Sequence, residues 1–300
     1  MNIPGEWAAG CGVLLVDKPP GKSSHDIVYA LRRLTGIKKI GHGGTLDPFA
    51  TGLMLMLVGK ATRLFDFLLP LEKQYRVTAQ FGATSTTGDI DGEIITLEGK
   101  VDEGALLRIL PDFMGKIEQR VPAYSAVKVD GVPLYRHTRA GRETRRPLRE
   151  VEVIRLNLVS FDTGRQQAVF DVNCSKGTYI RQLCEDIGAA LGTGAYAASL
   201  RRTAVGDLRV DMASGIEELT AMPRRTLLSM DNPSFISCLG ALYFLPVREL
   251  DENEEETVRN GRLLKGAQLT PVRLARQGSL MAVYGPADDA GVIRPLVVLA

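Results

Sequence analysis

The chain has 300 residues, of which 45% are hydrophobic and 24% charged, and its formal net charge is +2. This composition fits a globular protein with one large domain and a small one. It excludes a polycation, so any anionic partner must be bound by a local cluster of charge. The apolar runs fall far short of the ~20 residues that cross a bilayer, and the N-terminus lacks the features of a signal peptide. We therefore expect a cytoplasmic protein that does not bind a membrane.

The first part of the chain alternates between short strands and helices. In chain order the pattern predicts a strand at 12–16, a helix between 23 and 36, a buried strand at 53–58, a helix at 60–69, a half-buried strand at 72–81 and a helix at 102–114. The first helix is the best marked, because Ser23 and Asp26 resemble a capping box and Gly36 stands where a helix would end. Asp91 and Gly92 form a hairpin-type turn signal.

The second part begins with a strand and ends in a small β-rich tail. In order we predict a strand at 124–129, paired strands at 150–161 and 166–173, a helix at 178–191, a strand at 195–205 and a short helix at 214–221. We interpret 229–235 as a linker. From residue 245 short strands and turns alternate, with an acidic run at 251–256, which suits a small β-barrel-like appendage.

The stretch between the first predicted helix and the strand that follows it is a glycine-rich turn with two side chains that are able to take part in catalysis. His42 and Asp47 are carried by this turn, and Gly43 and Gly44 permit backbone angles that other residues avoid and let another molecule come close. Pro48 moves the preceding aspartate away from helical angles. Two interpretations remain open at this point: a functional carboxylate, or an aspartate that only bonds its own backbone in a turn.

A cluster of arginines lies at 136–149, where six arginines accompany a single glutamate. A solvated helix face usually carries mixed charges, whereas arginine forms bidentate hydrogen bonds with phosphate. The cluster therefore favours nucleic acid over a solvated face. It does not distinguish DNA from RNA.

Single aromatic and basic residues beside turns are further candidates. Tyr75 on its alternating strand fits a core tyrosine when taken alone. Arg181 follows Tyr179 in the first turn of a helix, where a cation opposes the helix dipole, so a carboxylate partner is expected. Asp47 is a candidate partner, but the sequence alone does not pair the two. No nucleotide, dinucleotide or nucleophile-turn motif occurs, and the four cysteines and three histidines show no metal-site spacing, so no cofactor is expected.

Five segments in register resemble one known family. They read KPPGKSS, GHGGTLDPFATG, KQYRV, SKGTYIRQLCEDIG and SLRRTAVG, and they extend from about residue 12 to 208. Together they are similar to the TruB family of tRNA pseudouridine synthases. The resemblance implies an α+β fold: a catalytic domain at 1–240 with a mixed, mostly antiparallel sheet flanked by helices, a basic RNA-gripping insertion at about 120–150, and a PUA-like RNA-binding domain at 245–300.

The implied activity is isomerisation of uridine to pseudouridine at position 55 in the T-loop of tRNA. The enzyme would flip the base, detach uracil from C1′ and rejoin it through C5, with no cofactor. The implied partner is the T-arm stem-loop of tRNA, with no guide RNA or protein partner, and the chain is expected to act as a monomer.

Position by position, the resemblance also implies roles. Asp47 matches the catalytic aspartate, which would act on C1′, on C6 or on a sugar proton; the sequence does not choose among these. Contacts to the RNA backbone would come from Arg136, Arg139, Arg142, Arg145, Arg146 and Arg202. The remaining matches are Tyr75, stacking on the target base; Arg181, pairing with the aspartate; Tyr179 and Leu200, lining the uracil pocket; His42, filling the gap in the T-loop; and Lys18, with either a structural role or an RNA contact.

Two alternatives remain at this stage. An RNA chaperone that refolds tRNA without essential catalysis would need the same surface. A related synthase acting on another RNA, with a guide, would need a docking region for which the sequence gives no sign.

Overall fold

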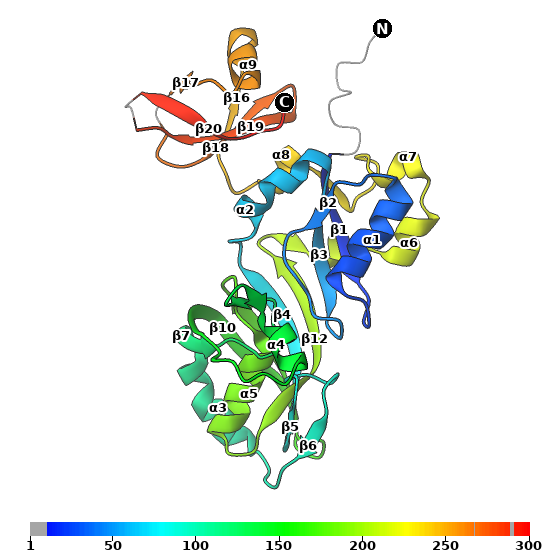
Figure 1. Ribbon diagram of the computed structural model, residues 1–300, viewed down its shortest axis with the longest axis vertical. Helices are drawn as coiled ribbons and strands as arrows, with labels where there is room; N and C mark the ends of the chain where they lie inside the picture. Colours follow the sequence, from blue (N-terminus) through cyan, green and yellow to red (C-terminus); the bar gives the residue numbers. More distant parts are fainter. Residues whose placement is uncertain (1–10, 267, 289–290) are drawn as a thin grey trace.

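The computed structural model describes residues 11–266, 268–288 and 291–300, and the N-terminal segment examined for a signal peptide lies almost entirely outside this part. In the described part, one mixed sheet of eleven strands forms the main body (Figure 1). Eight strands make a continuous path in the order β14 (Ser214–Gly215), β1 (Gly12–Lys18), β3 (Thr51–Val58), β12 (Ala195–Val205), β4 (Lys73–Phe81), β11 (Gln167–Cys174), β10 (Leu148–Asp162) and β7 (Gly115–Arg120). Three more pair at its side: β2 (Ile40–His42), β13 (Leu208–Arg209) and β15 (Phe235–Ser237). The pairing is antiparallel except for β1 with β14 and β3 with β12, which confirms the predicted mixed, mostly antiparallel sheet.

Helices cover the sheet and connect its strands. They are α1 (Ser24–Thr35), α2 (Phe65–Leu68), α3 (Glu103–Ile109), α4 (Leu134–Arg139), α5 (Ile180–Ala190), α6 (Ile216–Ala221), α7 (Arg224–Leu227) and α8 (Cys238–Ala241), with 3-10 turns at η2 (Gly59–Leu64), η3 (Leu110–Phe113) and η4 (Val210–Met212). The predicted first helix is confirmed with both caps: Ser23 and Asp26 form the capping box, and Gly36 ends the helix at φ 78°. The helix predicted at 60–69 is confirmed in part: its first half is the 3-10 turn η2, and residues 65–68 form the α-helix α2.

The sheet has two halves that meet where β3 lies parallel to β12. Only two residue pairs join these strands, Arg201 with Thr51 and Arg202 with Gly52. Gly52 has a φ of +102°, and a Cβ there would lie 2.2 Å from the Arg202 carbonyl oxygen, so only glycine permits this approach. The turn that carries Asp47 leads directly into β3. It therefore lies at the junction of the two halves, with buried core on either side.

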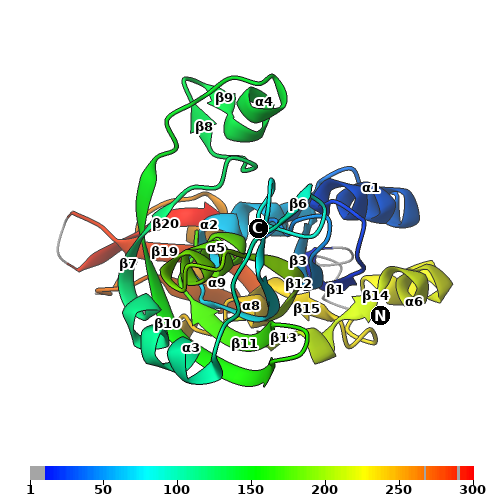
Figure 2. The same cartoon turned by 90° about the horizontal axis from the view of Figure 1, so that it is seen from below.

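The insertion between β7 and β10 projects away from the body (Figure 2). It contains α4 and a small hairpin, β8 (Lys128–Val129) and β9 (Val132–Pro133). The strand predicted at 124–129 is therefore mostly wrong. The reason is that carbonyl groups of this segment are used elsewhere: those of Ser125 and Val127 accept from backbone N–H groups of α4.

The tail is a five-stranded sheet with one helix. Its strands, in spatial order, are β16 (Val247–Glu249), β18 (Val272–Arg276), β19 (Ser279–Pro286), β20 (Val292–Val298) and β17 (Leu264–Lys265). The acidic run predicted within it forms α9 (Glu252–Arg259), capped by Asp251, and its glutamates pair with Arg248 and Arg276. Its negative charge is thus partly neutralised within the tail itself.

The segment interpreted as a linker is packed into the body. Asn232 and Ser234 are buried, and Phe235 begins β15, which pairs with β1. The tail then contacts the body directly: Lys60 Nζ donates to the Leu299 carbonyl at 2.7 Å, and Arg273 donates to the Leu239 carbonyl at 2.8 Å. A further small hairpin, β5 (Ala83–Ser85) with β6 (Ile94–Thr96), contains the predicted turn at Asp91. Within the described ranges, no helix is both long and apolar enough to cross a membrane.

Candidate active site

A cavity of about 480 Å³ opens at the junction of the two sheet halves. Among the residues that line it are six that the sequence analysis selected from four separate parts of the chain: Asp47, Tyr75, Tyr179, Arg181, Leu200 and Arg202. The fold therefore gathers most of the candidate catalytic and substrate-binding residues around one space, whereas His42, Lys18 and the arginines at 136–146 lie outside it. Its volume is adequate for one extruded base with its sugar.

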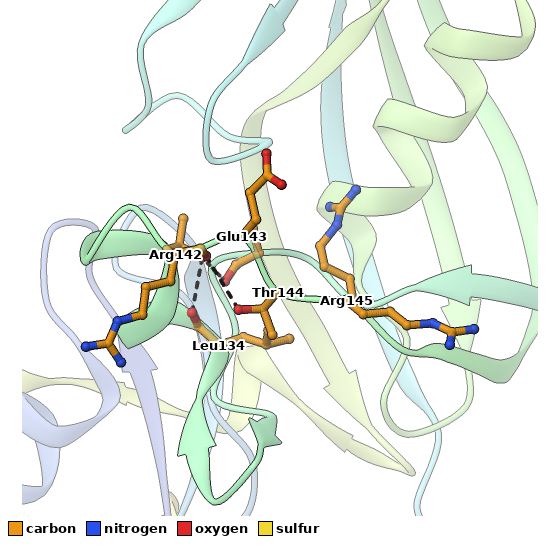
Figure 3. Close-up of a pocket in the computed structure, with 8 residues that line it drawn as sticks. Leu134, Arg142, Glu143, Thr144 and Arg145 are labelled. Carbon is orange, nitrogen blue, oxygen red and sulfur yellow. Dashed lines mark hydrogen bonds between the residues drawn. The ribbon is translucent and has the colours of Figure 1, made fainter.

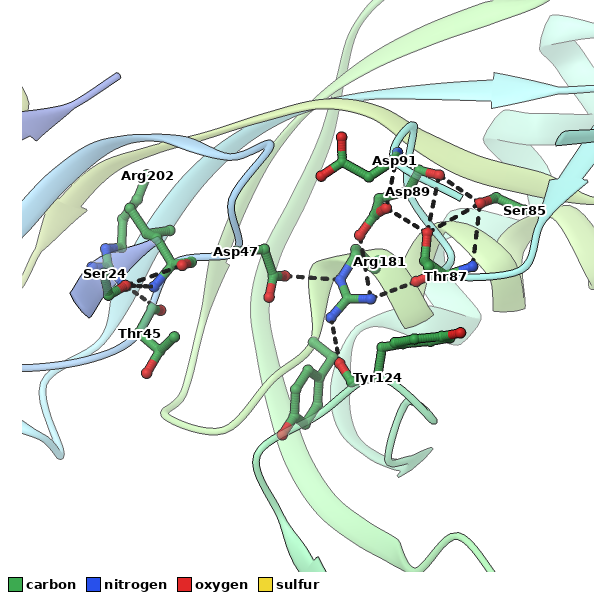
Figure 4. Close-up of polar contacts among 12 residues, drawn as sticks. Ser24, Thr45, Asp47, Ser85, Thr87, Asp89, Asp91, Tyr124, Arg181 and Arg202 are labelled. Carbon is green, nitrogen blue, oxygen red and sulfur yellow. Dashed lines mark hydrogen bonds and ion pairs between the residues drawn. The ribbon is translucent and has the colours of Figure 1, made fainter. Parts of the chain in front are cut away.

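Asp47 and Arg181 form an ion pair in this cavity, as the sequence hypothesis required. Arg181 Nε donates to Asp47 Oδ2 at 2.8 Å, across 134 positions of the chain (Figure 4). The arginine side chain is only 4% exposed, whereas Asp47 is 34% exposed. The carboxylate thus has a buried cation on one side and the open cavity on the other.

The guanidinium of Arg181 has three further partners. Its Nη1 donates to the Thr87 carbonyl and lies 3.4 Å from Asp89 Oδ2, and its Nη2 donates to the Tyr124 carbonyl at 3.0 Å. Burial raises the pKa of the Asp89 carboxyl, although Thr87 and Arg181 both oppose that rise. Sequence reasoning missed Asp89; the hairpin turn signal two residues later was the only indication that an acid stands at a bend there.

The turn that carries Asp47 is held by three polar side chains from other elements. Ser24 of α1 both accepts from the Leu46 N–H and donates to the Leu46 carbonyl. Arg202, which is 2% exposed, donates to the carbonyls of Leu53, Thr45 and Gly44. This geometry favours a structural support for Arg202, and the phosphate contact that the resemblance implies stays a prediction.

Lys18 is the third support. It is fully buried, and its Nζ donates to the carbonyls of Pro19, Lys22 and Pro48 at 2.7–3.0 Å. All three of its protons are used, so the geometry favours the structural role over the RNA contact that the sequence also left open. Burial lowers the pKa of Lys18 from 10.5 to about 8.

This buried charge predicts a specific dependence of stability on pH. Below pH 8 the folded and unfolded chains both hold the Lys18 proton, and the fold carries the full cost of burying the charge, about 3 kcal/mol. Between pH 8 and 10.5 the unfolded chain holds more protons, so the free energy of unfolding rises with pH. We expect wild type to gain about 2 to 3 kcal/mol relative to Lys18→Met between pH 7 and pH 10, measured by urea unfolding. Parallel curves for the two proteins would show that folding does not lower the pKa of Lys18.

Aromatic and aliphatic side chains form much of the cavity wall, among them Tyr75, Tyr179 and Leu200. Tyr75 is half-buried and packs against the core as well as lining the cavity, so it satisfies both interpretations of the sequence. Burial raises the pKa of the phenols of Tyr75 and Tyr179, and both remain neutral hydrogen-bonding rings near pH 7. Leu200, 6% exposed, supplies an apolar surface. Stacked aromatic and aliphatic walls suit a planar base.

His42 does not line this cavity. It borders a separate shallow cavity of about 520 Å³ together with His25, Tyr29 and Arg32 of α1. The rings of His42 and His25 meet edge to face with centroids 5.8 Å apart. Burial, with help from His25 and Arg202, lowers the pKa of His42. A neutral imidazole with a partly open face therefore lies beside the turn that carries Asp47 but outside the cavity.

The basic insertion presents its arginines on an exposed arm. The guanidinium carbons of Arg136 and Arg139 lie 6.0 and 5.8 Å from the centre of the Tyr135 ring. Arg142 and Arg145 are exposed and point to different sides of the following loop, where they border a cavity of about 590 Å³ (Figure 3). Arg146 is half-buried and faces Glu185 and Asp186 of α5. Burial raises the pKa values of these two carboxyls, and the charge of Arg146 opposes that rise.

Known proteins resemble both the fold and the sequence. A crystal structure of a Cbf5–Nop10–Gar1 complex matches with a TM-score of 0.74 at 25% identity, over 98% of this chain and 86% of that one. With the mixed sheet and its small β-rich tail, this likeness establishes the class: an α+β fold of the pseudouridine synthases, as predicted.

Sequence comparison is more specific. Residues 32–180 match the N-terminal domain model of the TruB family pseudouridylate synthases, and residues 181–231 match the C-terminal domain model of tRNA pseudouridylate synthase B. Proteins named tRNA pseudouridine synthase B are 47% identical in Bordetella pertussis, covering 73% of this chain and 92% of that protein, and 36% identical in an Arthrobacter species, covering 96% of both. The chain belongs to the TruB family of pseudouridylate synthases, and it is an enzyme.

Proposed function

We propose that this enzyme isomerises uridine 55 in the T-loop of tRNA, with Asp47 as the catalytic carboxylate. The observation that carries the proposal is the Asp47–Arg181 pair, 2.8 Å apart, at the wall of a base-sized cavity. The names of the relatives support tRNA as the substrate. A carboxylate that a buried guanidinium orients toward an open cavity is able to act as nucleophile or base.

The chemistry needs only the groups that the cavity supplies. The bond between N1 and C1′ breaks, a bond between C5 and C1′ forms, N1 gains a proton and C5 loses one. Asp47 acts on C1′, on C6 or on a sugar proton, and Arg181 orients its carboxylate through the hydrogen bond from Nε. No oxidant, reductant or external nucleophile enters the balance.

The target base must leave the folded T-loop before this chemistry begins. Flipping costs a few kcal/mol, and stacking on an aromatic ring returns about 1–3 kcal/mol per base. In our proposal Tyr75 stacks on the extruded uracil while Tyr179 and Leu200 close its other sides. His42, outside the cavity, fills the gap that the base leaves in the loop, for which a neutral, partly exposed imidazole is suited.

The insertion at about 120–150 supplies the grip on the RNA backbone in this proposal. Its exposed arginines, Arg136, Arg139, Arg142 and Arg145, stand on an arm that projects beside the body and are free to reach phosphates (Figure 2). We assign Arg146, which faces two carboxylates, only a lesser share of phosphate binding. Phosphate contacts position RNA without reading its sequence, so specificity comes from the loop shape and the extruded base. The tail at 245–300 is proposed as a PUA-like second RNA-binding domain.

A paired substitution tests the insertion's role. Arg142→Ala with Arg145→Ala is expected to weaken tRNA binding and to flatten its dependence on salt by roughly one unit of slope or less per lost phosphate contact. The matched control is Arg224→Ala with Arg225→Ala, two exposed arginines of α7 on a different face (Figure 1). An unchanged slope for the first pair, measured by filter binding across salt concentrations, would mean that the cluster is only a solvated surface.

Because the ion pair and the cavity are formed by a single chain, we propose that the enzyme acts as a monomer without a guide RNA or protein partner. The test is to incubate the pure protein with an unmodified T-arm stem-loop and locate pseudouridine by mass spectrometry. Pseudouridine at the position corresponding to 55 is expected. Activity only after a cell extract is added would contradict independent action.

A further inference from the structure

Gln119 of β7 is a buried side chain whose amide pairs with the backbone of Tyr179 in both directions. Its Nε2 donates to the Tyr179 carbonyl at 3.0 Å, and the Tyr179 N–H donates to its Oε1 at 2.7 Å. The residue is 1% exposed and does not line the cavity. Its amide thus acts as the peptide group of a neighbouring strand would, across 60 positions of the chain.

This pairing fixes the point where α5 begins. Tyr179 is the residue before the first helical turn, has extended backbone angles of φ −98° and ψ 107°, and has no side-chain cap of its own. The first N–H groups of a helix lack partners within the helix. The Gln119 amide therefore holds the backbone orientation from which the helix starts, and with it the direction of the Tyr179 ring.

The same orientation sets the position of Arg181, two residues further along. Its Nε must reach Asp47 while its Nη2 reaches the Tyr124 carbonyl. A small rotation of the first turn of α5 would displace both contacts together. Gln119 also lies two residues before Val121, whose N–H donates to the Pro147 carbonyl and so joins the two ends of the insertion. Its amide thus connects the base of the RNA-binding arm to the helix that carries the arginine.

We propose that Gln119 is a positioning residue for the isomerisation, which orients Tyr179 and Arg181 toward the bound base. The proposal rests on the function assigned to the cavity above. Gln119 touches neither the base nor the reacting atoms; it acts through the start of α5. Misplacement of a catalytic group by about 1 Å costs about 100-fold in rate, so its effect belongs to the chemical step more than to binding.

The first test is Gln119→Met, which keeps the length of the side chain and removes both hydrogen bonds. The assay uses tRNA transcribed with uridine tritiated at C5, because that tritium is released when C5 joins C1′. We expect the single-turnover rate to fall by about 10- to 100-fold, with the tRNA dissociation constant nearly unchanged. Gln166→Met is the matched control: Gln166 makes the same reciprocal pair of bonds, with Val101, and does not line the cavity.

The second test is Gln119→Glu across pH. Its ionised carboxylate still accepts from the Tyr179 N–H but has no proton for the Tyr179 carbonyl, so the rate is low at pH 8. Burial raises the pKa of a carboxyl, and the protonated form is an isostere of glutamine that donates again. The rate relative to wild type is therefore expected to increase as the pH falls to about 5.5.

The outcomes separate positioning from stability. Rate loss in Gln119→Met without equal loss in Gln166→Met, together with recovery of Gln119→Glu at low pH, supports the proposal. The proposal would be overturned by wild-type rates in both Gln119 variants. It would also be overturned if the rate fell in all three variants in proportion to the melting temperature and Gln119→Glu did not recover at low pH. The tritium assay reports isomerisation at any uridine, so a target outside the T-loop would refute the proposed position in tRNA and leave this comparison intact.

Discussion

Asp47→Asn is expected to lower the single-turnover rate of pseudouridine formation by about 10⁴-fold or more, the range for loss of a catalytic nucleophile or its partner. The amide is nearly isosteric and still able to accept a hydrogen bond from Arg181 Nε, but it is neither a nucleophile nor a base. Because the cavity walls and the arginine-bearing arm are untouched, tRNA affinity should change little. Rapid mixing with excess enzyme measures the rate, and filter binding measures the affinity.

The matched control for this experiment is Asp91→Asn. Asp91 is an exposed aspartate on the β5–β6 hairpin near the same site, and the hydrogen bond it makes there uses its backbone N–H. Its loss removes one negative charge without changing the Asp47–Arg181 pair. A near-wild-type rate is expected. If Asp47→Asn retained comparable turnover, the carboxylate would have no catalytic role.

Arg181→Met should damage both catalysis and folding. Removing the guanidinium leaves the Asp89 carboxylate, 7% exposed, without its buried cation. Breaking a buried pair by removing one partner costs about 3–5 kcal/mol, a loss we ascribe to Asp89, since Asp47 is more open to water. The rate should fall by about 100-fold or more, because the donor that orients Asp47 is gone. Arg181→Lys should recover part of the stability but little of the rate, since an ammonium lacks the planar fork that reaches all four oxygen partners.

A surface pair provides the control for Arg181. Arg76 pairs with Asp171 at 2.8 Å on neighbouring strands β4 and β11, but the two side chains are 56% and 41% exposed. Exposed pairs contribute about 1 kcal/mol or less, so Arg76→Met should leave urea unfolding and turnover nearly unchanged. Equal effects of the two substitutions would show that the Arg181 network is not a buried catalytic support.

The periodic elements of the fold could be predicted from local pattern. The strand at 195–205 and the caps of α1 were confirmed to the residue. Errors fell where distant groups decide local structure. Segment 124–129 has strand-like composition, but its carbonyls serve α4 and Arg181. Residues 229–235 have the composition of a linker, but Ser234 and Phe235 at their end bond to β1, which lies far away in the chain.

The site residues could be predicted only where the local sequence carries a signal. Asp47 on its turn and Arg181 at a helix start each carry a local signal: an acid beside glycines, and a cation that opposes a helix dipole. The sequence does not show whether a lysine or arginine is buried, so RNA contacts were a reasonable prediction for Lys18 and Arg202. In the structure, both side chains donate to backbone carbonyls. Asp89 had only the turn signal at Asp91 and Gln119 had none, because the partners that connect them to the site, Arg181 and Tyr179, lie far away in the chain.

A crystal structure of the Asp47→Asn protein bound to a T-arm stem-loop would show whether the cavity takes up the target base. We predict one uracil inside the cavity, stacked on Tyr75 and bordered by Leu200, with the side chain of residue 47 about 3 to 4 Å from C1′ or C6 of that nucleotide. A complex in which every loop base stays stacked within the RNA, with the cavity holding only water, would contradict the account.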